Sequence, residues 1–389
     1  MSSTQQLEDR YTLATYNNIR FPMTLVRGEG SWVIDDRGER YLDLYGGHAV
    51  SSLGHSHPRW VKAIAEQAAT LDFYSNVVYC PVRAEAARRL VEKCYDMYGV
   101  FFCSSGAEAN ETALKIARKA SGRPFVVALE NDFHGRTIGA LSVTGFKSSR
   151  DLFPQNIAQW TKFVPLGDVA ALEALDASEI AAVILEPIQS VVGVEMAAPE
   201  YYRALRTWCD AHDVALIFDE VQTGNGRTGK WFIGEHWGVA PDIVTTAKGV
   251  GGGFPVGAVL ANERLARTVL PGDQATTFGG GPMACAAVVE TYRILEDERV
   301  VERVAELSQR VIETLRGRIG RGVREVRGLG YLLGVACEEP AKVIQKRFLD
   351  ARILVGTSGA PNVIRLLPPL TVSAAEWGIF FDALDAVFG

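Results

Sequence analysis

The sequence predicts an α/β protein in which a mostly parallel sheet lies between helices, with a smaller α+β domain at the C-terminal end. Three observations support this fold class: strand-like and helix-like segments alternate through the middle of the chain, the strand-like segments are apolar without interruption, and the pattern changes near Pro282. Strands that are apolar throughout are covered on both faces, which is typical of parallel sheets. The 389 residues are also enough for more than one domain.

The middle of the chain supplies the alternating elements. Runs rich in Val, Ile and Phe predict strands, and they occupy residues 98–103, 124–130, 180–187 and 214–221. Two of the intervening segments are predicted to be helices, at residues 106–121 and 199–212. Helices that connect successive strands in this way cover the faces of the sheet.

The chain after residue 281 is predicted to form a separate unit. Apolar residues recur every three to four positions through residues 282–319, which predicts one long helix. Short strands and further helices follow at residues 331–337, 340–351, 363–368 and 374–388. We therefore expect an N-terminal segment that packs with the small domain, a large α/β domain and a small α+β domain, formed by residues 1–45, 46–281 and 282–389.

The composition is that of an ordinary globular protein without an electrostatic attraction to nucleic acid. Hydrophobic residues make up 48% and charged residues 22% of the chain, and the formal net charge is −6. This balance argues against nucleic acid or an acidic membrane as a partner. No apolar stretch approaches the roughly 20 residues that cross a bilayer, and the first residues show no secretion signal. We expect a cytoplasmic protein.

The cysteines and histidines do not predict a metal site. The six cysteines are scattered without a Cys-x-x-Cys pair, as expected of buried thiols in a reducing compartment. His55 and His57 are close in sequence, but two ligands without a neighbouring carboxylate or thiol make a poor site. We interpret them as part of a turn before Pro58 and predict no metal.

Lys248 stands at an unusual place for a lysine. It follows a short apolar strand that contains Ile243 and Val244, and the residues after it, GVGGG, form a loop almost without side chains. A structural lysine normally lies along the surface with its amine in water. An amine that burial keeps partly uncharged can instead form a Schiff base with an aldehyde.

The segment FFCSSGAEANE leads from a strand directly into a helix. The first N–H groups of a helix have no internal partner, its dipole favours an anion, and Gly106 lets an anion come close. The same residues also suit an ordinary helix cap. This segment alone leaves both interpretations open.

Asp219 stands at the end of the apolar strand predicted at 214–221. A carboxylate there is costly unless a cation or several donors meet it, so it either caps the next turn or faces a cation such as a protonated ring nitrogen. Gln222 could hydrogen-bond an oxygen on that ring. Together, a phosphate site, a carboxylate for a pyridinium and an amine for an aldehyde are the groups that bind pyridoxal 5′-phosphate.

Seven ordered motifs carry a resemblance to a known family. The chain contains, in the order found in class-III aminotransferases of fold type I, the motifs SSGAEANE, FHGRT, ILEPIQ, IFDEVQTGNGRTGKWF, AKGVGGGFPVGA, TTFGGGPMACAA and IRLLPPL. The resemblance covers essentially the whole chain and is strongest to the acetylornithine aminotransferases of this class. It implies a fold-type I large domain with a seven-stranded sheet, pyridoxal 5′-phosphate as cofactor and a homodimer with shared active sites.

The resemblance also implies roles for individual residues. Lys248 would form the Schiff base and move the proton between substrate and cofactor, Asp219 would keep the pyridine nitrogen protonated, and Gln222 would contact the phenolic oxygen. The other implied cofactor contacts are Ser105, Gly106 and Ala107 at the phosphate, Phe133 and Val221 on the two ring faces, Glu186 beside them, and Thr277 from the neighbouring subunit.

Two arginines resemble the substrate-binding residues of the family. A planar guanidinium binds a carboxylate at two points, which suits a dicarboxylate. The resemblance implies that Arg365 binds the α-carboxylate of glutamate or 2-oxoglutarate. Arg136 would bind the other carboxylate, and the α-carboxylate of an acylornithine. Ser75 and Asn76 are expected at the mouth of the pocket.

One position departs from the family pattern. In relatives the segment Glu-Pro-x-Gln is followed by Gly-Glu-Gly-Gly, whereas EPIQSVVG places Val191 at the second glutamate. In those relatives the glutamate pairs with the arginine equivalent to Arg365 while a terminal-amine donor binds. We expect that Arg365 stays open to carboxylates here, or that another residue replaces the glutamate.

The sequence thus predicts transfer of an ω-amino group from N2-acetyl-L-ornithine to 2-oxoglutarate, giving N-acetylglutamate 5-semialdehyde and glutamate in arginine biosynthesis. Succinylornithine, ornithine, 4-aminobutyrate and a carrier-linked intermediate of lysine synthesis are alternative donors for the same scaffold. A protein that binds the cofactor without catalysis is an alternative of another class. Binding alone, however, would not require Lys248, Asp219 and both arginines together.

Overall fold

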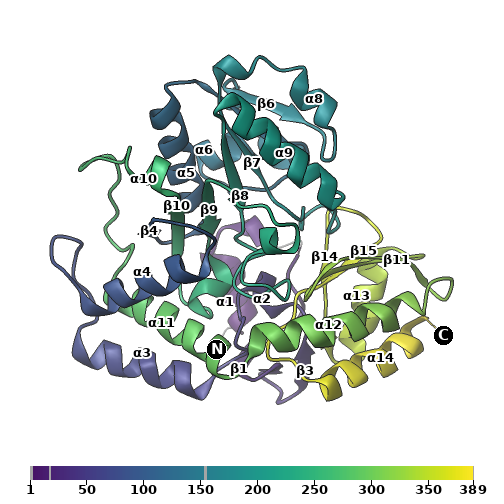
Figure 1. The fold of residues 1–389 in the computed structure, drawn as a ribbon. Coiled ribbons are helices and arrows are strands. Elements are labelled where there is room, and N and C mark those ends of the chain that lie inside the picture. The colour runs from purple at the N-terminus through teal and green to yellow at the C-terminus, as the bar shows by residue number, and fades with distance from the viewer. Residues whose placement is uncertain (1–2, 17–18, 153–155, 389) are drawn as a thin grey trace.

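The computed structural model describes residues 3–16, 19–152 and 156–388 and contains three sheets within this part of the chain (Figure 1). The largest has seven strands, in the order β4 (Gly99–Cys103), β10 (Gly257–Ala261), β9 (Ile243–Thr246), β8 (Ala215–Asp219), β7 (Ile180–Leu185), β5 (Phe125–Leu129) and β6 (Thr161–Val164). Strand β10 is antiparallel to both of its neighbours, and the pairs from β9 to β6 are parallel. The predicted mostly parallel sheet is therefore confirmed.

Two helices cover opposite faces of this sheet (Figure 1). Helix α5 (Gly106–Ser121) packs in the same buried cluster as Ala182 and Ile184, whereas helix α9 (Pro199–His212) packs with Val183 and Leu185. Successive side chains of a strand point to opposite faces, so an unbroken apolar strand can fill two cores. This is why strands that are apolar without interruption predicted a sheet that is covered on both faces.

The C-terminal part has its own sheet, with the order β11 (Val323–Leu329), β12 (Leu332–Cys337), β15 (Val363–Leu366) and β14 (Gly356–Thr357). Helices α12 (Val300–Arg316), α13 (Ala341–Asp350) and α14 (Ala374–Phe388) contribute to the same buried cluster. Strands β12 and β15 and helices α13 and α14 match predicted elements, whereas β11 and β14 were not predicted.

The single helix predicted over residues 282–319 is wrong. The structure divides it into α11 (Pro282–Asp297) and α12, with Arg299 in the left-handed region at φ 49°. Apolar residues of α11 pack in a cluster with residues of α4 (Pro81–Lys93), and those of α12 pack in the C-terminal core. Ile294 and Leu295, near the end of α11, also lie in the C-terminal core. The apolar periodicity continues across Arg299 and gave no sign of the break.

The N-terminal strands form a third sheet, which the sequence did not predict. Strands β1 (Leu25–Glu29), β2 (Trp32–Asp35) and β3 (Arg40–Asp43) pair antiparallel in succession, and β3 pairs in parallel with β13 (Ile353–Leu354). Residues near the two ends of the chain therefore share one sheet. We retain the domain limits 1–45, 46–281 and 282–389 as a proposal.

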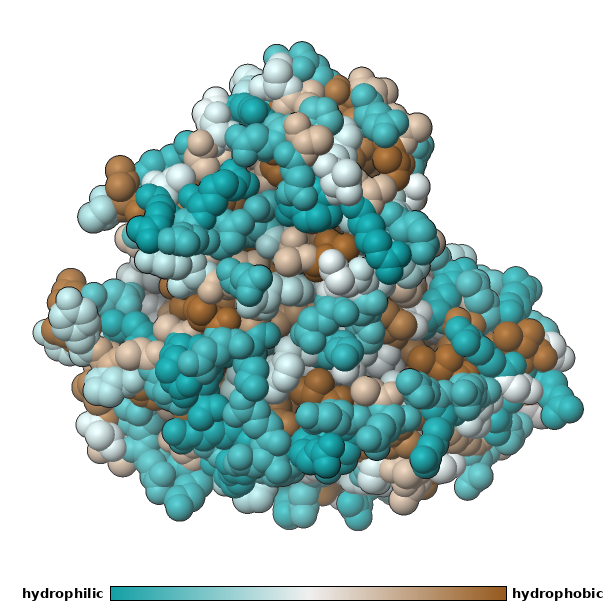
Figure 2. Space-filling model, in the orientation of Figure 1, coloured by the Kyte–Doolittle hydropathy of each residue, from teal (hydrophilic) through white to brown (hydrophobic). Residues whose placement is uncertain are grey.

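Shorter elements complete the described chain. They are α1 (Thr4–Tyr11), α2 (Gly46–Ala49), α3 (Pro58–Thr70), α6 (Ile138–Ser142), α7 (Lys147–Arg150), α8 (Val169–Glu173), α10 (Glu263–Ala266) and the 3₁₀ turns η1 (Ala14–Tyr16), η2 (Ala177–Glu179), η3 (Ile233–His236) and η4 (Lys248–Gly251). The face seen in Figure 2 is mostly hydrophilic, with apolar residues in small groups. Within the described ranges, no helix combines the length and apolar character needed to cross a bilayer.

His55 and His57 contact different carboxylates. His55 Nε2 lies 2.8 Å from Asp43 Oδ2, and His57 Nε2 lies 3.3 Å from Glu298 Oε1. Among the described residues, no group of three or more His, Cys, Asp and Glu side chains is arranged to hold a metal ion.

Candidate active site

The candidate residues gather at the carboxyl ends of the central strands, where ligands bind in open α/β sheets. Asp219 is the last residue of β8, Glu186 follows β7 directly, and Lys248 follows β9 after one intervening residue. The loop that contains Phe133 follows β5. The parallel direction of these strands brings together residues that are far apart in the sequence.

Lys248 is partly buried and has a left-handed backbone, at φ 49°. Burial lowers the pKa of its amine, and the positive charge of Arg365 acts in the same direction. The charges of Asp219 and Glu186 oppose this shift. A lowered pKa makes more of the nucleophilic neutral amine available. Non-glycine residues hold this backbone conformation only where the surroundings impose it.

The start of helix α5 lies against the segments that carry Lys248 and Val221. Ser105 is the N-cap, and its Oγ accepts a hydrogen bond from Glu108 N at 3.3 Å. A Cβ added to Gly106 would lie 2.9 Å from Val221 Cγ2. The missing side chain therefore allows the helix N-terminus to approach the site. Ala107 faces Gly135 equally closely, because a Cβ on that glycine would lie 2.7 Å from Ala107 Cβ.

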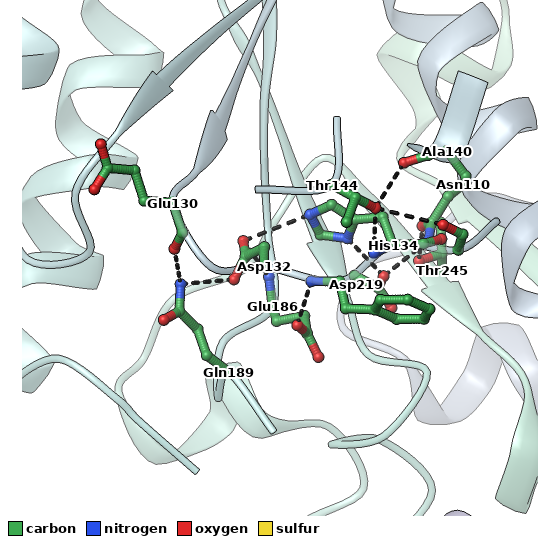
Figure 3. A network of polar contacts seen from close by, with 12 residues as sticks. Asn110, Glu130, Asp132, His134, Ala140, Thr144, Glu186, Gln189, Asp219 and Thr245 are labelled. Carbon is green, nitrogen blue, oxygen red and sulfur yellow. Dashed lines mark hydrogen bonds and ion pairs between the residues drawn. The ribbon is translucent and has the colours of Figure 1, made fainter. Parts of the chain in front are cut away.

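Asp219 is buried and accepts three hydrogen bonds, of which those from Asn110 and His134 are seen in Figure 3. Asn110 Nδ2 donates to Oδ2 at 2.7 Å, His134 Nδ1 lies 2.8 Å from the same oxygen, and Val221 N donates to Oδ1 at 3.1 Å. Asn110 is fixed in turn, since its Oδ1 accepts from Thr245 Oγ1 at 2.7 Å. Donors on both oxygens fix the direction of this carboxylate.

His134 lies between Asp219 and a second buried carboxylate, Asp132 (Figure 3). Its Nε2 is 3.5 Å from Asp132 Oδ2. Burial opposes the charge of the imidazole, but the interactions with the two carboxylates outweigh it and raise the pKa of His134 to about 10. His134 lies in the motif FHGRT, but the sequence did not predict it as a site residue, because a lone histidine gives no sign of two carboxylates brought from other positions.

We expect the exchange His134→Gln to lower the free energy of unfolding by about 3 kcal/mol, because it removes a cation from between two buried carboxylates. The folded-state pKa of about 10 lies above the ordinary value of 6.5. The contribution is therefore complete below pH 6.5 and is lost as the pH rises through 10. The unmodified protein and the variant should be unfolded with urea at several pH values between 6.5 and 10. The difference between their free energies of unfolding should become smaller as the pH rises.

His212→Gln is the control for this exchange, because His212 is exposed and contacts no carboxylate among the described residues. Its Nδ1 lies 2.8 Å from Trp208 O of the same helix, and its ring lies 4.7 Å from the Trp208 ring. The control exchange should change stability little at any of these pH values. A stability loss for His134→Gln that stays constant across the window would contradict a charged His134.

Glu186 and Gln189 complete the network on the other side of Asp132. Glu186 Oε2 accepts from Phe133 N at 2.7 Å, and Gln189 Nε2 donates to Asp132 Oδ1 at 2.8 Å. Burial raises the pKa of Glu186, and the charges of Asp132 and Asp219 add to this. The Glu186 contact fixes the backbone at Phe133, which was predicted to cover one face of the cofactor ring.

The two candidate substrate arginines differ in their surroundings. The guanidinium carbon of Arg136 lies 5.5 Å from the centre of the Phe133 ring, and the side chain is exposed. Arg365 is buried, and its charge acts on Lys248. Burial lowers the pKa of Arg365. The charge of Arg365 therefore acts on the amine of Lys248, whereas Arg136 lies against the ring of Phe133.

Three other predicted residues lie on largely exposed loops. Thr277 is exposed, and Asn76 Nδ2 donates to Gly279 O of the same loop at 2.9 Å. Ser75 precedes Asn76 and is partly exposed. No hydrogen bond within the described residues joins these side chains to Lys248 or to either arginine. Their predicted roles are proposals.

The residues present fit pyridoxal 5′-phosphate. Gln222 Oε1 is buried and has no hydrogen-bond partner among the described residues, as expected if a bound group supplies one. Lys248 would take the aldehyde, Asp219 would face the ring nitrogen, and the start of α5 would hold the phosphate. The first N–H groups of α5 and the positive end of its dipole suit a phosphate.

Comparisons with known proteins agree on one family. The family model described as aminotransferase class-III matches residues 14–388. Acetylornithine aminotransferase of Methanosarcina acetivorans is 41% identical over 97% of this chain and 94% of its own length, and that of Methanopyrus kandleri is 45% identical over 96% and 95%. Each covers nearly the whole of both proteins.

Solved structures give the same result. The ornithine aminotransferase of Toxoplasma gondii superposes with a TM-score of 0.93 at 30% identity and covers 100% of this chain and 95% of its own. The acetylornithine aminotransferase of Elizabethkingia anophelis has a TM-score of 0.87 at 30% identity over 99% and 97%. The chain therefore belongs to the class-III aminotransferases, fold-type I enzymes whose cofactor is pyridoxal 5′-phosphate.

Proposed function

We propose that this enzyme transfers the terminal amino group of N2-acetyl-L-ornithine to 2-oxoglutarate, a step of arginine biosynthesis. The observation that carries the aminotransferase chemistry is the partly buried amine of Lys248, next to Asp219 at the ends of adjacent strands. The choice of donor rests on the 41% to 45% identity with acetylornithine aminotransferases over nearly the whole chain.

The side chains divide the chemistry among them. Bound pyridoxal phosphate supplies an aldehyde that takes up the amino group and a ring that withdraws electrons from the carbon next to it. Lys248 Nζ takes the proton from the substrate carbon that carries the amine, which a lowered pKa permits. Asp219 holds the ring nitrogen in its protonated form. Phe133 and Val221 fix the plane of the ring.

The arginines orient the substrates. Arg365 binds the carboxylate attached to the reacting carbon of glutamate or 2-oxoglutarate, because its charge lies close to that of Lys248. Arg136 binds a carboxylate at the far end of the substrate, from its place over Phe133. Ser75 and Asn76 line the mouth of the pocket.

The active unit is a homodimer in which Thr277 contacts the phosphate of the other subunit. Support comes from an apolar surface around this residue: Phe278 is 68% exposed, Val77 is 81% exposed and Tyr79 is fully exposed. Exposed apolar patches of this kind mark protein contacts. Light scattering should give the mass of two chains.

The six free cysteines suit the cytoplasm, where thiols stay reduced.

A panel of donors with 2-oxoglutarate as acceptor tests the choice of substrate. We expect kcat/KM to be highest for N2-acetyl-L-ornithine and lower for succinylornithine, ornithine and 4-aminobutyrate. Ornithine is the second candidate, because the Toxoplasma gondii ornithine aminotransferase has a TM-score of 0.93 with this chain. A higher kcat/KM for any other donor would replace acetylornithine in the proposal, and absence of glutamate with every donor would refute it.

A further inference from the structure

Arg365 is held entirely by neutral oxygen atoms within the described residues. Its four hydrogen bonds run from Nε to Thr357 O at 2.8 Å, from Nη1 to Ser190 O at 3.4 Å and Ser190 Oγ at 3.2 Å, and from Nη2 to the Tyr45 hydroxyl at 3.1 Å. The guanidinium carbon also lies 5.7 Å from the centre of the Tyr45 ring. Tyr45 is therefore the main side chain that this arginine meets.

The ring of Tyr45 is fixed against the strand pair that carries Arg365. Gly356 is the cross-strand partner of Arg365, and a Cβ on Gly356 would lie 2.1 Å from Tyr45 Cε2. The absence of a side chain at Gly356 thus makes the space that the tyrosine fills. From there the hydroxyl reaches across to the guanidinium.

The backbone after Tyr45 adopts a rare conformation that supports this placement. Gly46, Gly47, His48 and Ala49 all have positive φ angles, between 55° and 68°. Two of these residues are not glycine, and such strain persists only where neighbouring contacts impose it. Asp43 Oδ1 supplies such contacts, because it accepts from Tyr45 N at 2.9 Å and from Gly46 N at 2.8 Å.

The groups that face Arg365 do not neutralise it at neutral pH. Burial raises the pKa of Tyr45, so the hydroxyl stays protonated. Burial, together with the charges of Arg365 and Lys248, lowers the pKa of His48 to about 4, so this imidazole is uncharged. Glu186 is the acid whose charge acts on Arg365, and burial raises its pKa.

Val191 is the position at which relatives carry a glutamate, and here it brings no charge. Its backbone oxygen accepts from Gly359 N at 2.6 Å, which ties the segment after Ser190 to the loop before β15. The structure thus answers the question that the sequence left open. The guanidinium of Arg365 donates hydrogen bonds to neutral oxygen atoms of Tyr45 and Ser190. Among the described residues, no acidic side chain forms a hydrogen bond or an ion pair with it.

We propose that Tyr45 is a positioning residue that holds Arg365 through a neutral hydroxyl, so that the guanidinium keeps its full charge for a carboxylate on the reacting carbon of the substrate. The inference rests on the proposed function, since it assigns substrates to the two half-reactions. A 2-oxo acid gains the ion pair with Arg365. A terminal-amine donor, which has no carboxylate at the reacting carbon, leaves this charge unpaired.

Tyr45→Phe tests this role, because it removes one oxygen atom and keeps the ring. We expect the dissociation constant of the holoenzyme for glutarate, an unreactive dicarboxylate, to rise about tenfold by calorimetry, the cost of one hydrogen bond to a charged group. KM for 2-oxoglutarate should rise by a similar factor, with kcat and the KM of the amine donor changed less than about twofold. Tyr41→Phe is the matched control: Tyr41 is a buried tyrosine whose hydroxyl accepts a hydrogen bond from Arg352, whereas Tyr45 is partly buried, and glutarate binding should not change.

A second variant, Val191→Glu, restores the acid that relatives carry. It should weaken glutarate binding about tenfold or more and lower the KM of the amine donor, because the new carboxylate competes for Arg365. Glutarate binding unchanged by Tyr45→Phe, or KM and kcat of both half-reactions unchanged by Val191→Glu, would overturn the proposal. Glutarate binding does not depend on the identity of the donor, so a failure of the donor panel would leave this test intact.

Discussion

Lys248→Ala is expected to reduce kcat by about a thousandfold or more, because general acid–base catalysis and the covalent contact with the cofactor are lost together. The protein should still fold and bind pyridoxal phosphate, since the start of α5, Asp219 and Gln222 remain. The visible absorbance of the bound cofactor should change. Single-turnover assays of each half-reaction, followed by that absorbance, measure the loss directly.

Lys62→Ala is the control for the loss of a lysine. Lys62 lies in helix α3, its side chain is 74% exposed, and it forms one surface ion pair with Glu66. Surface ion pairs of this kind contribute little to stability, so this variant should fold normally and retain full activity. If Lys248→Ala kept a kcat near that of the unmodified enzyme, the mechanism derived from the site would be wrong.

Asp219→Asn should lower kcat of both half-reactions about a hundredfold, which corresponds to losing about 3 kcal/mol of a buried charge interaction. Asp219 accepts from Asn110 and His134 on one oxygen and from Val221 N on the other. The side-chain amide of the variant has an NH2 group in place of one oxygen, and this group must face one of these hydrogen-bond donors. The variant loses both the charge that faces the ring nitrogen and part of its hydrogen bonding.

Asp242→Asn separates this effect from the general cost of a buried carboxamide. Asp242 is also buried, and its Oδ2 accepts from Leu216 N and Arg206 Nη1, each at 2.8 Å. It directly precedes β9, at the opposite end of that strand from Lys248. We expect Asp242→Asn to lower the midpoint of urea unfolding with kcat nearly unchanged. Equal losses of kcat in the two variants would show that Asp219 has no special role.

The sequence alone predicted most of the central sheet and three residues of the candidate site. Strands β7 and β8 are apolar throughout because both of their faces are covered, so local composition was enough to predict them. Lys248 and Asp219 were predicted as site residues in a similar way, because each is a charged residue at or just after the end of an apolar strand. Gly106 was predicted from the step of strand into helix.

The tertiary structure decided what depends on residues far apart in the chain. His134 became part of the site because β5 and β8 end at the same edge of the sheet, and this placed its imidazole between Asp132 and Asp219. The contact between Tyr45 and Arg365 joins positions 320 residues apart. The break at Arg299 separates α11, whose apolar residues pack with α4 and in the C-terminal core, from α12, whose apolar residues pack in the C-terminal core. The local pattern of apolar residues indicates that a residue is buried, but only the folded chain determines which residues it contacts.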